Sequence, residues 1–355
     1  MRNSLRPVPV LVCVALIATL LGIAPTPALA ATTRGDLDKV PVEFGAEVVE
    51  IEPFSTIGVS WTGSSETPPA IEVHTASGWM SLGNVGAEPD LGPDDGSTEA
   101  VAAEQVTGDE RFSEPFWVGD ANGYRVRARR GVRDATVHLI RTRTVMVPVL
   151  QQDQAGAAAA PHDGPAIHGR SEWGAAPPAS SPTTAPAVKM AIVHHTAGSN
   201  NYTPEQVPSI IAGIQTYHQR SQGWNDIGYN FLVDKFGRIW EGRAGGIGAA
   251  VVGAHASGAN TGSVGVSVLG DYTSSGASAA AIAAVGAVIG WKFALHGVDA
   301  NATTTVTGNE SNKFTPGQVV TLPTIVGHRD VGTTSCPGMI QGQLDLIRSF
   351  AAARA

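Results

Sequence analysis

The stretch "VKMAIVHHTAG", residues 188–198, runs from a series of apolar residues into two histidines and a polar turn. The short apolar run "MAIV", residues 190–193, before a polar turn is typical of a strand buried on both faces of a sheet. "PTIVGHRD", residues 323–330, repeats the pattern and also ends on a histidine. Because the ends of neighbouring buried strands can converge at one rim of a sheet, we expect His194 and His328 to lie close together.

The segments around these two strands alternate between helical and extended patterns. Thr203 and Pro204 are typical first residues of a helix, and an apolar stripe follows them to Tyr217. "YNFLVDKFGRIWEGR" predicts a hairpin, "SVGVSVLGDY" a further strand, and the stretches ending near 297 and 353 predict two more helices. Residues 165–355 are therefore predicted to form an α/β unit with a mixed central sheet flanked by helices.

Residues 31–150 have a different character. Short β-branched or aromatic runs such as "TIGVSW", "PFWVGD" and "ATVHLIRTRTV" are separated by Gly, Asp, Asn and Pro. This spacing predicts a small all-β, sandwich-like N-terminal domain, in which the acidic "GAEPDLGPDDGSTEA" forms a long loop. No cluster of titratable residues stands out, so we assign no chemistry here. Residues 151–164, small and polar with Pro and Gly, are interpreted as a linker.

The first thirty residues have the pattern of a secretory signal peptide. Arg2 and Arg6 precede a long apolar run, and "ALA" at 28–30 is a small-residue cleavage site. A retained membrane anchor is the alternative, but the cleavage site favours removal, together with Cys13. No later segment is apolar over the ~20 residues of a spanning helix. We expect a secreted monomer, extracellular or in the cell wall, without a membrane anchor after cleavage.

The charge balance narrows the possible partners. The chain has 23 Lys and Arg against 31 Asp and Glu, a formal net charge of −8. Binding to nucleic acid requires a basic surface that neutralises phosphates. The acidic composition therefore argues against nucleic acid as a partner.

Cys336 is the only cysteine besides Cys13, and it follows His328 in "GHRDVGTTSCPG", residues 327–338. A single remaining cysteine cannot form an intramolecular disulfide. Two imidazoles and a thiolate suit Zn²⁺, and three protein ligands leave one coordination position open, as in catalytic sites. A metal would also keep this thiolate from stray oxidation. A buried structural cysteine and a Cys–His nucleophile remain alternatives at this point.

Six motifs in order give the sequence a family resemblance. They resemble those of bacterial peptidoglycan recognition proteins and zinc-dependent N-acetylmuramoyl-L-alanine amidases, the type 2 amidases. The resemblance covers residues 165–350 and does not extend to the N-terminal half. The motifs are "RSEWGA" (170–175), "IVHHTAG" (192–198), "WNDIGYNF" (224–231), "GRIWEGR" (237–243), "GAHA" with "NTGSVGVSVLG" (253–270), and "GHRDVGTTSCPG".

The resemblance implies a role for each matching residue. His194, His328 and Cys336 would bind Zn²⁺, and the reaction would be hydrolysis of the amide between the lactyl group of muramic acid and L-alanine. Tyr229 would lie beside the zinc water, and Thr334 would help to polarise the scissile carbonyl or its oxyanion. No HExxH-type glutamate follows His194, so the general base stays open.

Two further histidines, His255 and His195, are weaker candidates for substrate binding. His255 in "GAHA" matches a motif near the substrate cleft, with a structural role as the alternative. His195 adjoins His194 and points to the opposite face of a strand, which favours packing or support of the ligands over substrate binding.

A non-catalytic module that binds peptidoglycan or muropeptides is the rival function. Such relatives typically lose the zinc cysteine, whereas Cys336 is present here. The Gly-Trp pair associated with diaminopimelate-type stem peptides is missing from "AGGIGAAVVGAHA", so the stem-peptide preference stays open.

Overall fold

The computed structural model describes residues 29–82, 90–148 and 164–354. The predicted signal peptide lies outside these residues, apart from Leu29 and Ala30, which begin the first strand. The predicted linker also lies outside them, apart from Gly164.

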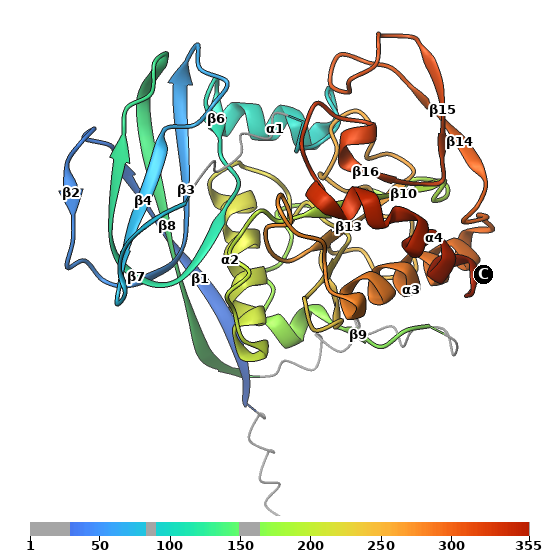
Figure 1. The fold of residues 1–355 in the computed structure, drawn as a ribbon, viewed down its shortest axis with the longest axis horizontal. Coiled ribbons are helices and arrows are strands. Elements are labelled where there is room, and N and C mark those ends of the chain that lie inside the picture. The colour runs from blue at the N-terminus through green and yellow to red at the C-terminus, as the bar shows by residue number, and fades with distance from the viewer. Residues whose placement is uncertain (1–28, 83–89, 149–163, 355) are drawn as a thin grey trace, which may run out of the picture.

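The N-terminal half forms one eight-stranded sheet, here called the N-terminal sheet (Figure 1). Its main path runs β1-β8-β3-β7-β4-β5, with β2 paired to β7 and β6 to β3, and its pairs are antiparallel. The strands are β1 (Leu29–Pro41), β2 (Glu47–Val48), β3 (Phe54–Gly63), β4 (Ala70–Thr75), β5 (Gly78–Ser81), β6 (Arg111–Phe112), β7 (Phe116–Arg127) and β8 (Val132–Pro148).

Two predictions for this half were wrong in detail. The strands are hydrogen-bonded into one sheet rather than the two of a sandwich. The region is also not all-β, because the acidic segment expected to be a loop ends in helix α1 (Thr98–Thr107). Ser97 Oγ accepts a hydrogen bond from Ala100 N at 3.1 Å and so caps this helix. Ser97, Thr98 and Glu99 are typical of a helix N-terminus. The Gly and Pro residues before them favoured the interpretation of the whole segment as a loop.

The C-terminal half is built on a mixed sheet, as predicted, which has six strands in the order β16-β10-β13-β11-β12-β9. The first four strands are parallel, β12 is antiparallel to β11, and β9 is parallel to β12. The strands are β9 (Ile167–His168), β10 (Met190–His195), β11 (Phe231–Val233), β12 (Ile239–Glu241), β13 (Ser263–Val268) and β16 (Ile325–Gly327). A separate hairpin, β14 (Thr303–Thr307) with β15 (Val319–Pro323), was not foreseen.

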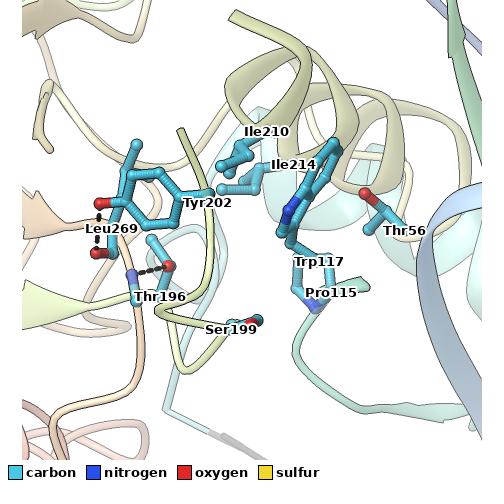
Figure 2. A pocket seen from close by; sticks show the side chains of 11 residues that line it. Thr56, Pro115, Trp117, Thr196, Ser199, Tyr202, Ile210, Ile214 and Leu269 are labelled. Atoms are coloured by element: carbon cyan, nitrogen blue, oxygen red, sulfur yellow. Dashed lines mark hydrogen bonds between the residues drawn. The ribbon is translucent and has the colours of Figure 1, made fainter. Parts of the chain in front are cut away.

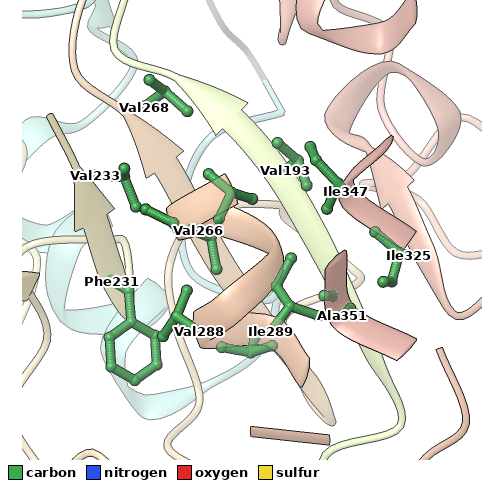
Figure 3. Close-up of a cluster of buried hydrophobic side chains, with 14 of the residues drawn as sticks. Val193, Phe231, Val233, Val266, Val268, Val288, Ile289, Ile325, Ile347 and Ala351 are labelled. Atoms are coloured by element: carbon green, nitrogen blue, oxygen red, sulfur yellow. The ribbon is translucent and has the colours of Figure 1, made fainter. Parts of the chain in front are cut away.

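Helices cover both faces of this central sheet. α3 (Ala279–His296) and α4 (Leu344–Ala352) pack on one face, where Val193, Val266 and Val288 belong to the largest apolar cluster (Figure 3). α2 (Val207–Arg220) lies on the other face. Short 3-10 turns precede or join these helices at Arg170–Trp173, Pro204–Gln206, His328–Asp330 and Gly338–Gln343.

α3 alone among the described helices is long and apolar enough to cross a membrane, and 67% of it is buried. Its position against the central sheet is that of a core helix.

α2 also packs against the N-terminal sheet, through β1, β3 and β8 (Figure 1). The approach is close, since a Cβ added at Gly58 would lie 2.3 Å from the Tyr217 ring and one at Gly35 would clash with Thr216. Figure 2 shows a small cavity at this junction, where Trp117 from the N-terminal sheet faces Ile210 and Ile214 of α2. The two halves therefore share a packed, apolar contact.

Candidate metal centre

Two adjacent parallel strands place the first two candidate ligands side by side. β10 pairs with β16 in a register that sets Val193 opposite Gly327. The next residue on each strand is therefore a histidine at the same rim, and the ring centroids of His194 and His328 are 4.6 Å apart. The Asp330 side chain accepts a hydrogen bond from Gly327 N at 2.9 Å, which fixes the turn at the end of β16.

The loop after His328 returns Cys336 to the same rim. Arg329 N donates to Cys336 O at 2.8 Å, and Cys336 N donates to Thr334 Oγ1 at 3.0 Å, so the loop closes on itself. Cys336 Sγ lies 3.8 Å from His194 Nδ1. It also accepts a hydrogen bond from His195 N at 3.4 Å.

The result is a compact set of three buried donors. One ligand atom from each of His194, His328 and Cys336 lies within 4.8 Å of the other two, and no side chain of the three is more than 1% exposed. Two imidazole nitrogens and one sulfur in this spacing are a donor set that suits zinc.

A second histidine fixes the orientation of His194. His255 Nδ1 lies 3.0 Å from His194 Nε2, and the two rings are perpendicular at 75°. Burial, reinforced by His328 and then His255, lowers the pKa of His194 well below its usual value. Burial likewise lowers the pKa of His255 to about 3. Both rings are therefore neutral near pH 7, the form in which an imidazole can bind a metal.

Tyr229 and Thr334 lie beside this donor set. Tyr229 precedes β11, is 1% exposed, and its ring centroid is 5.4 Å from that of His194. Thr334 lies two residues before Cys336, and its hydroxyl accepts the Cys336 N–H. Thr334 thus lies in the loop that holds Cys336, whereas Tyr229 comes from the segment before β11.

Three other polar residues near the donor set, His195, His218 and Asp330, have structural partners. The His195 side chain lies away from the donor set, and its Nδ1 accepts a hydrogen bond from Tyr272 N at 3.0 Å. His218 is buried, accepts a hydrogen bond from Gly228 N at 3.1 Å and lies against Trp224, so it is a core residue. Asp330 bonds Gln341 and its own turn rather than an imidazole.

Sequence reasoning did not identify His255 as the partner of His194. The two residues are 61 positions apart, and "GAHA" gives no periodic signal that would orient the ring. His255 is fully buried and its ring contacts the candidate ligand His194.

Comparisons with known proteins find relatives of the half that carries this site. The model of the N-acetylmuramoyl-L-alanine amidase family matches residues 184–339. Peptidoglycan-recognition protein SC2 of Drosophila simulans is 35% identical over 175 residues, which are 49% of this chain and 82% of that protein. The human N-acetylmuramoyl-L-alanine amidase is 31% identical over 194 residues, 52% of this chain and 28% of that protein.

Among solved structures, bumblebee peptidoglycan recognition protein SA aligns with a TM-score of 0.41 and 28% identity, over 51% of this chain and 94% of that one. The sequence relationship to the Drosophila protein spans most of that protein. The match to the family model, residues 184–339, contains all the candidate site residues. The chain belongs to the family of peptidoglycan recognition proteins and N-acetylmuramoyl-L-alanine amidases.

Proposed function

We propose that this protein is a secreted zinc hydrolase that cleaves the amide between N-acetylmuramic acid and L-alanine in peptidoglycan. The observation that supports this most directly is the meeting of His194, His328 and Cys336 at one rim of the central sheet. The relationship to the human amidase and to the matched amidase family supports the reaction class.

The three donors fit a zinc ion. Zinc takes imidazole nitrogen and thiolate sulfur in tetrahedral sites, and catalytic sites have three protein ligands. The donors are buried, and the His195 N–H directed at Cys336 Sγ would stabilise a thiolate. When bound, zinc would act as a Lewis acid toward the amide carbonyl and would make water a stronger nucleophile near neutral pH.

The surrounding residues would then position the reacting groups. The His255 contact holds the His194 ring so that Nδ1 faces the sulfur. The Tyr229 hydroxyl would donate to the developing oxyanion or hold a proton during transfer. The Thr334 hydroxyl, already fixed by the Cys336 N–H, would supply a second donor beside the same carbonyl.

A binding module without catalysis is the second candidate. Relatives carry the name peptidoglycan-recognition protein, so binding of peptidoglycan or muropeptides is expected in either case. The presence of Cys336 beside both histidines favours catalysis, because recognition alone does not require a buried thiol next to two imidazoles.

We further propose the division into a signal peptide over residues 1–30, an N-terminal domain over 31–150, a linker over 151–164 and the amidase domain over 165–355. Secretion and a monomeric state belong to the same proposal. The motifs lie in the last unit, and the N-terminal sheet has its own apolar core.

Mass analysis of muropeptides after digestion, with and without a chelator, tests the activity. We expect free stem peptides that begin with L-alanine, no product after chelation, and about one zinc per chain by metal analysis. Cys336→Ser should bind muropeptide but yield no product. Binding of muropeptide without any cleavage by zinc-loaded wild type would instead establish the recognition function.

A further inference from the structure

Residues 90–107, here called the acidic cover segment, leave the N-terminal sheet and lie against the metal centre (Figure 1 shows their helix, α1). Asp90 Oδ2 accepts a hydrogen bond from Thr333 N, in the loop between His328 and Cys336. A Cβ added at Gly332 would lie 3.0 Å from this carboxylate oxygen and 3.1 Å from His328 Nε2. The start of the segment thus lies directly beside a candidate ligand.

Asp94 fastens the segment to the loop that follows His255. Its Oδ1 accepts hydrogen bonds from Gly258 N at 2.9 Å, Asn260 N at 3.1 Å and Asn260 Nδ2 at 2.8 Å. Its Oδ2 accepts from Thr261 N at 3.1 Å and Thr261 Oγ1 at 2.8 Å. Asn260 Oδ1 in turn holds His255 N at 2.8 Å. One carboxylate of the N-terminal half therefore organises the loop that carries a ligand-supporting histidine.

Glu99 on α1 fastens the segment to a third part of the site. It pairs with Arg243, whose side chain is 3% exposed, and accepts a hydrogen bond from Asn225 N at 2.8 Å. Leu91 packs against an apolar cluster that contains Trp224. Of these partners, Trp224 and Asn225 lie in the turn that carries Tyr229, and Arg243 follows β12.

The residues of the site are enclosed, and the cover segment contacts three of the segments around them. His194, His255 and His328 are 0% exposed, and Tyr229 and Cys336 are 1% exposed. An amide within a wall polymer must approach the metal and both hydroxyls closely to react. A site closed to this degree cannot accept such a substrate until the covering residues move.

We propose that the acidic cover segment is a built-in inhibitor of this protein, held over the metal centre by Asp90, Asp94 and Glu99. That the segment inhibits hydrolysis rests on the proposed amidase function. That it covers the metal centre can be measured without assuming this function. The segment contacts the 333 loop, the 257–261 loop and the 224–229 turn, so a muropeptide and the segment would compete for the same faces. Release of the segment would then switch the enzyme on.

Carboxylates bonded to several N–H groups and to a buried guanidinium form strong, charge-assisted contacts. Removing two of them should shift the balance between closed and open states toward open by at least about tenfold. Asp94→Asn and Glu99→Gln keep the side-chain volumes and should be made singly and together. Glu104→Gln is the matched control, because Glu104 is an exposed carboxylate on the same helix.

Alkylation of Cys336 by iodoacetamide in the zinc-free full chain reports opening. Cys13→Ser in every variant makes Cys336 the only thiol. We expect slow labelling in this background and in Glu104→Gln, and labelling at least about tenfold faster in the double variant, with the single variants between them. Thermal unfolding of each variant identifies those that are misfolded. If the double variant is misfolded, the labelling rates of the single variants are compared with that of Glu104→Gln instead.

Hydrolysis of a soluble muropeptide by the zinc-loaded variants is the second readout, and kcat/KM should rise with the labelling rate. Faster labelling without hydrolysis in any variant would support the cover and count against the amidase function. Labelling of the folded Cys13→Ser protein at the rate of the urea-unfolded chain would overturn the cover, as would equal rates in the double variant and Glu104→Gln.

Discussion

His194 Nε2 and His255 Nδ1 are 3.0 Å apart, which leaves His194 Nδ1 directed toward Cys336 Sγ. A hydrogen bond to the far nitrogen of a ligating imidazole fixes its tautomer and ring orientation. His255→Phe should therefore weaken zinc binding by about 10- to 100-fold, because loss of such a supporting contact typically has this effect. Competition with a fluorescent zinc chelator measures the affinity.

His218→Phe is the control for that experiment. His218 is equally buried and also contacts the ring of Tyr229, but it bonds Gly228 N rather than a candidate ligand. We expect its zinc affinity to match that of wild type. Equal weakening in both variants would mean that general loosening of the core, rather than the His194–His255 contact, governs zinc affinity.

Tyr229→Phe and Thr334→Val test the two hydroxyl groups. Each change removes one hydrogen-bond donor beside the donor set while keeping most of the packing. Thr334→Val also removes the acceptor of the Cys336 N–H, so the metal analysis checks that the loop still holds zinc. Loss of a donor to a developing oxyanion typically lowers kcat by about 10²–10³. We expect losses of this size with zinc content near one per chain, checked by steady-state kinetics and metal analysis on the same samples. Unchanged kcat in both variants would remove these residues from the reaction.

The sequence predicted the central sheet well because its signals are local. "AIVHH" and "TIVGH" are short, β-branched apolar runs that favour buried strands. The parallel register of β10 with β16 then brings His194 and His328 together. The convergence of Cys336 depended on a loop of suitable length, which the spacing allowed but did not require. The family resemblance favoured a zinc ligand at Cys336 over a structural cysteine or a Cys–His nucleophile.

The contacts between the two halves could not be read from the sequence. Asp94 and Glu99 lie 164 and 144 residues from Gly258 and Arg243, and nothing in an acidic, Gly- and Pro-rich stretch indicates a long-range partner. Such a stretch is normally a solvated loop. Its carboxylates acquire a role only because the fold presents N–H groups and a buried arginine to them.

Gly58→Val tests the packing of the N-terminal sheet on α2. A Cβ at this position would lie 2.3 Å from Cε2 of Tyr217, a fully buried ring that cannot move aside freely. Overpacking of this kind typically lowers the free energy of unfolding by about 1–3 kcal/mol. Gly342→Ala is the control, since a Cβ there meets no atom within 4 Å. Urea unfolding of both variants measures the difference, and equal stability would place the two halves in looser contact than described.

His138 on β8 should make the stability of the protein depend on pH. Its ring is 1% exposed, bonds Ser60 Oγ at 2.9 Å and lies against Tyr217, and burial lowers the pKa of His138 to about 3. Below pH 6.5 the unfolded chain takes up a proton at this residue that the folded chain does not, so stability falls as the pH drops from 6.5 toward 3. At pH 5 the cost is about 2 kcal/mol.

His138→Gln removes this proton uptake. The loss of unfolding free energy between pH 7.5 and pH 5, measured by urea unfolding, should therefore be smaller than in wild type by about 2 kcal/mol. Ser60→Ala removes the hydrogen bond to the ring but no titrating group, so it should lower stability similarly at both pH values and keep the wild-type pH dependence. Identical pH dependence in wild type and His138→Gln would show that this imidazole can be protonated in the folded protein, and that the junction between β8 and α2 admits solvent.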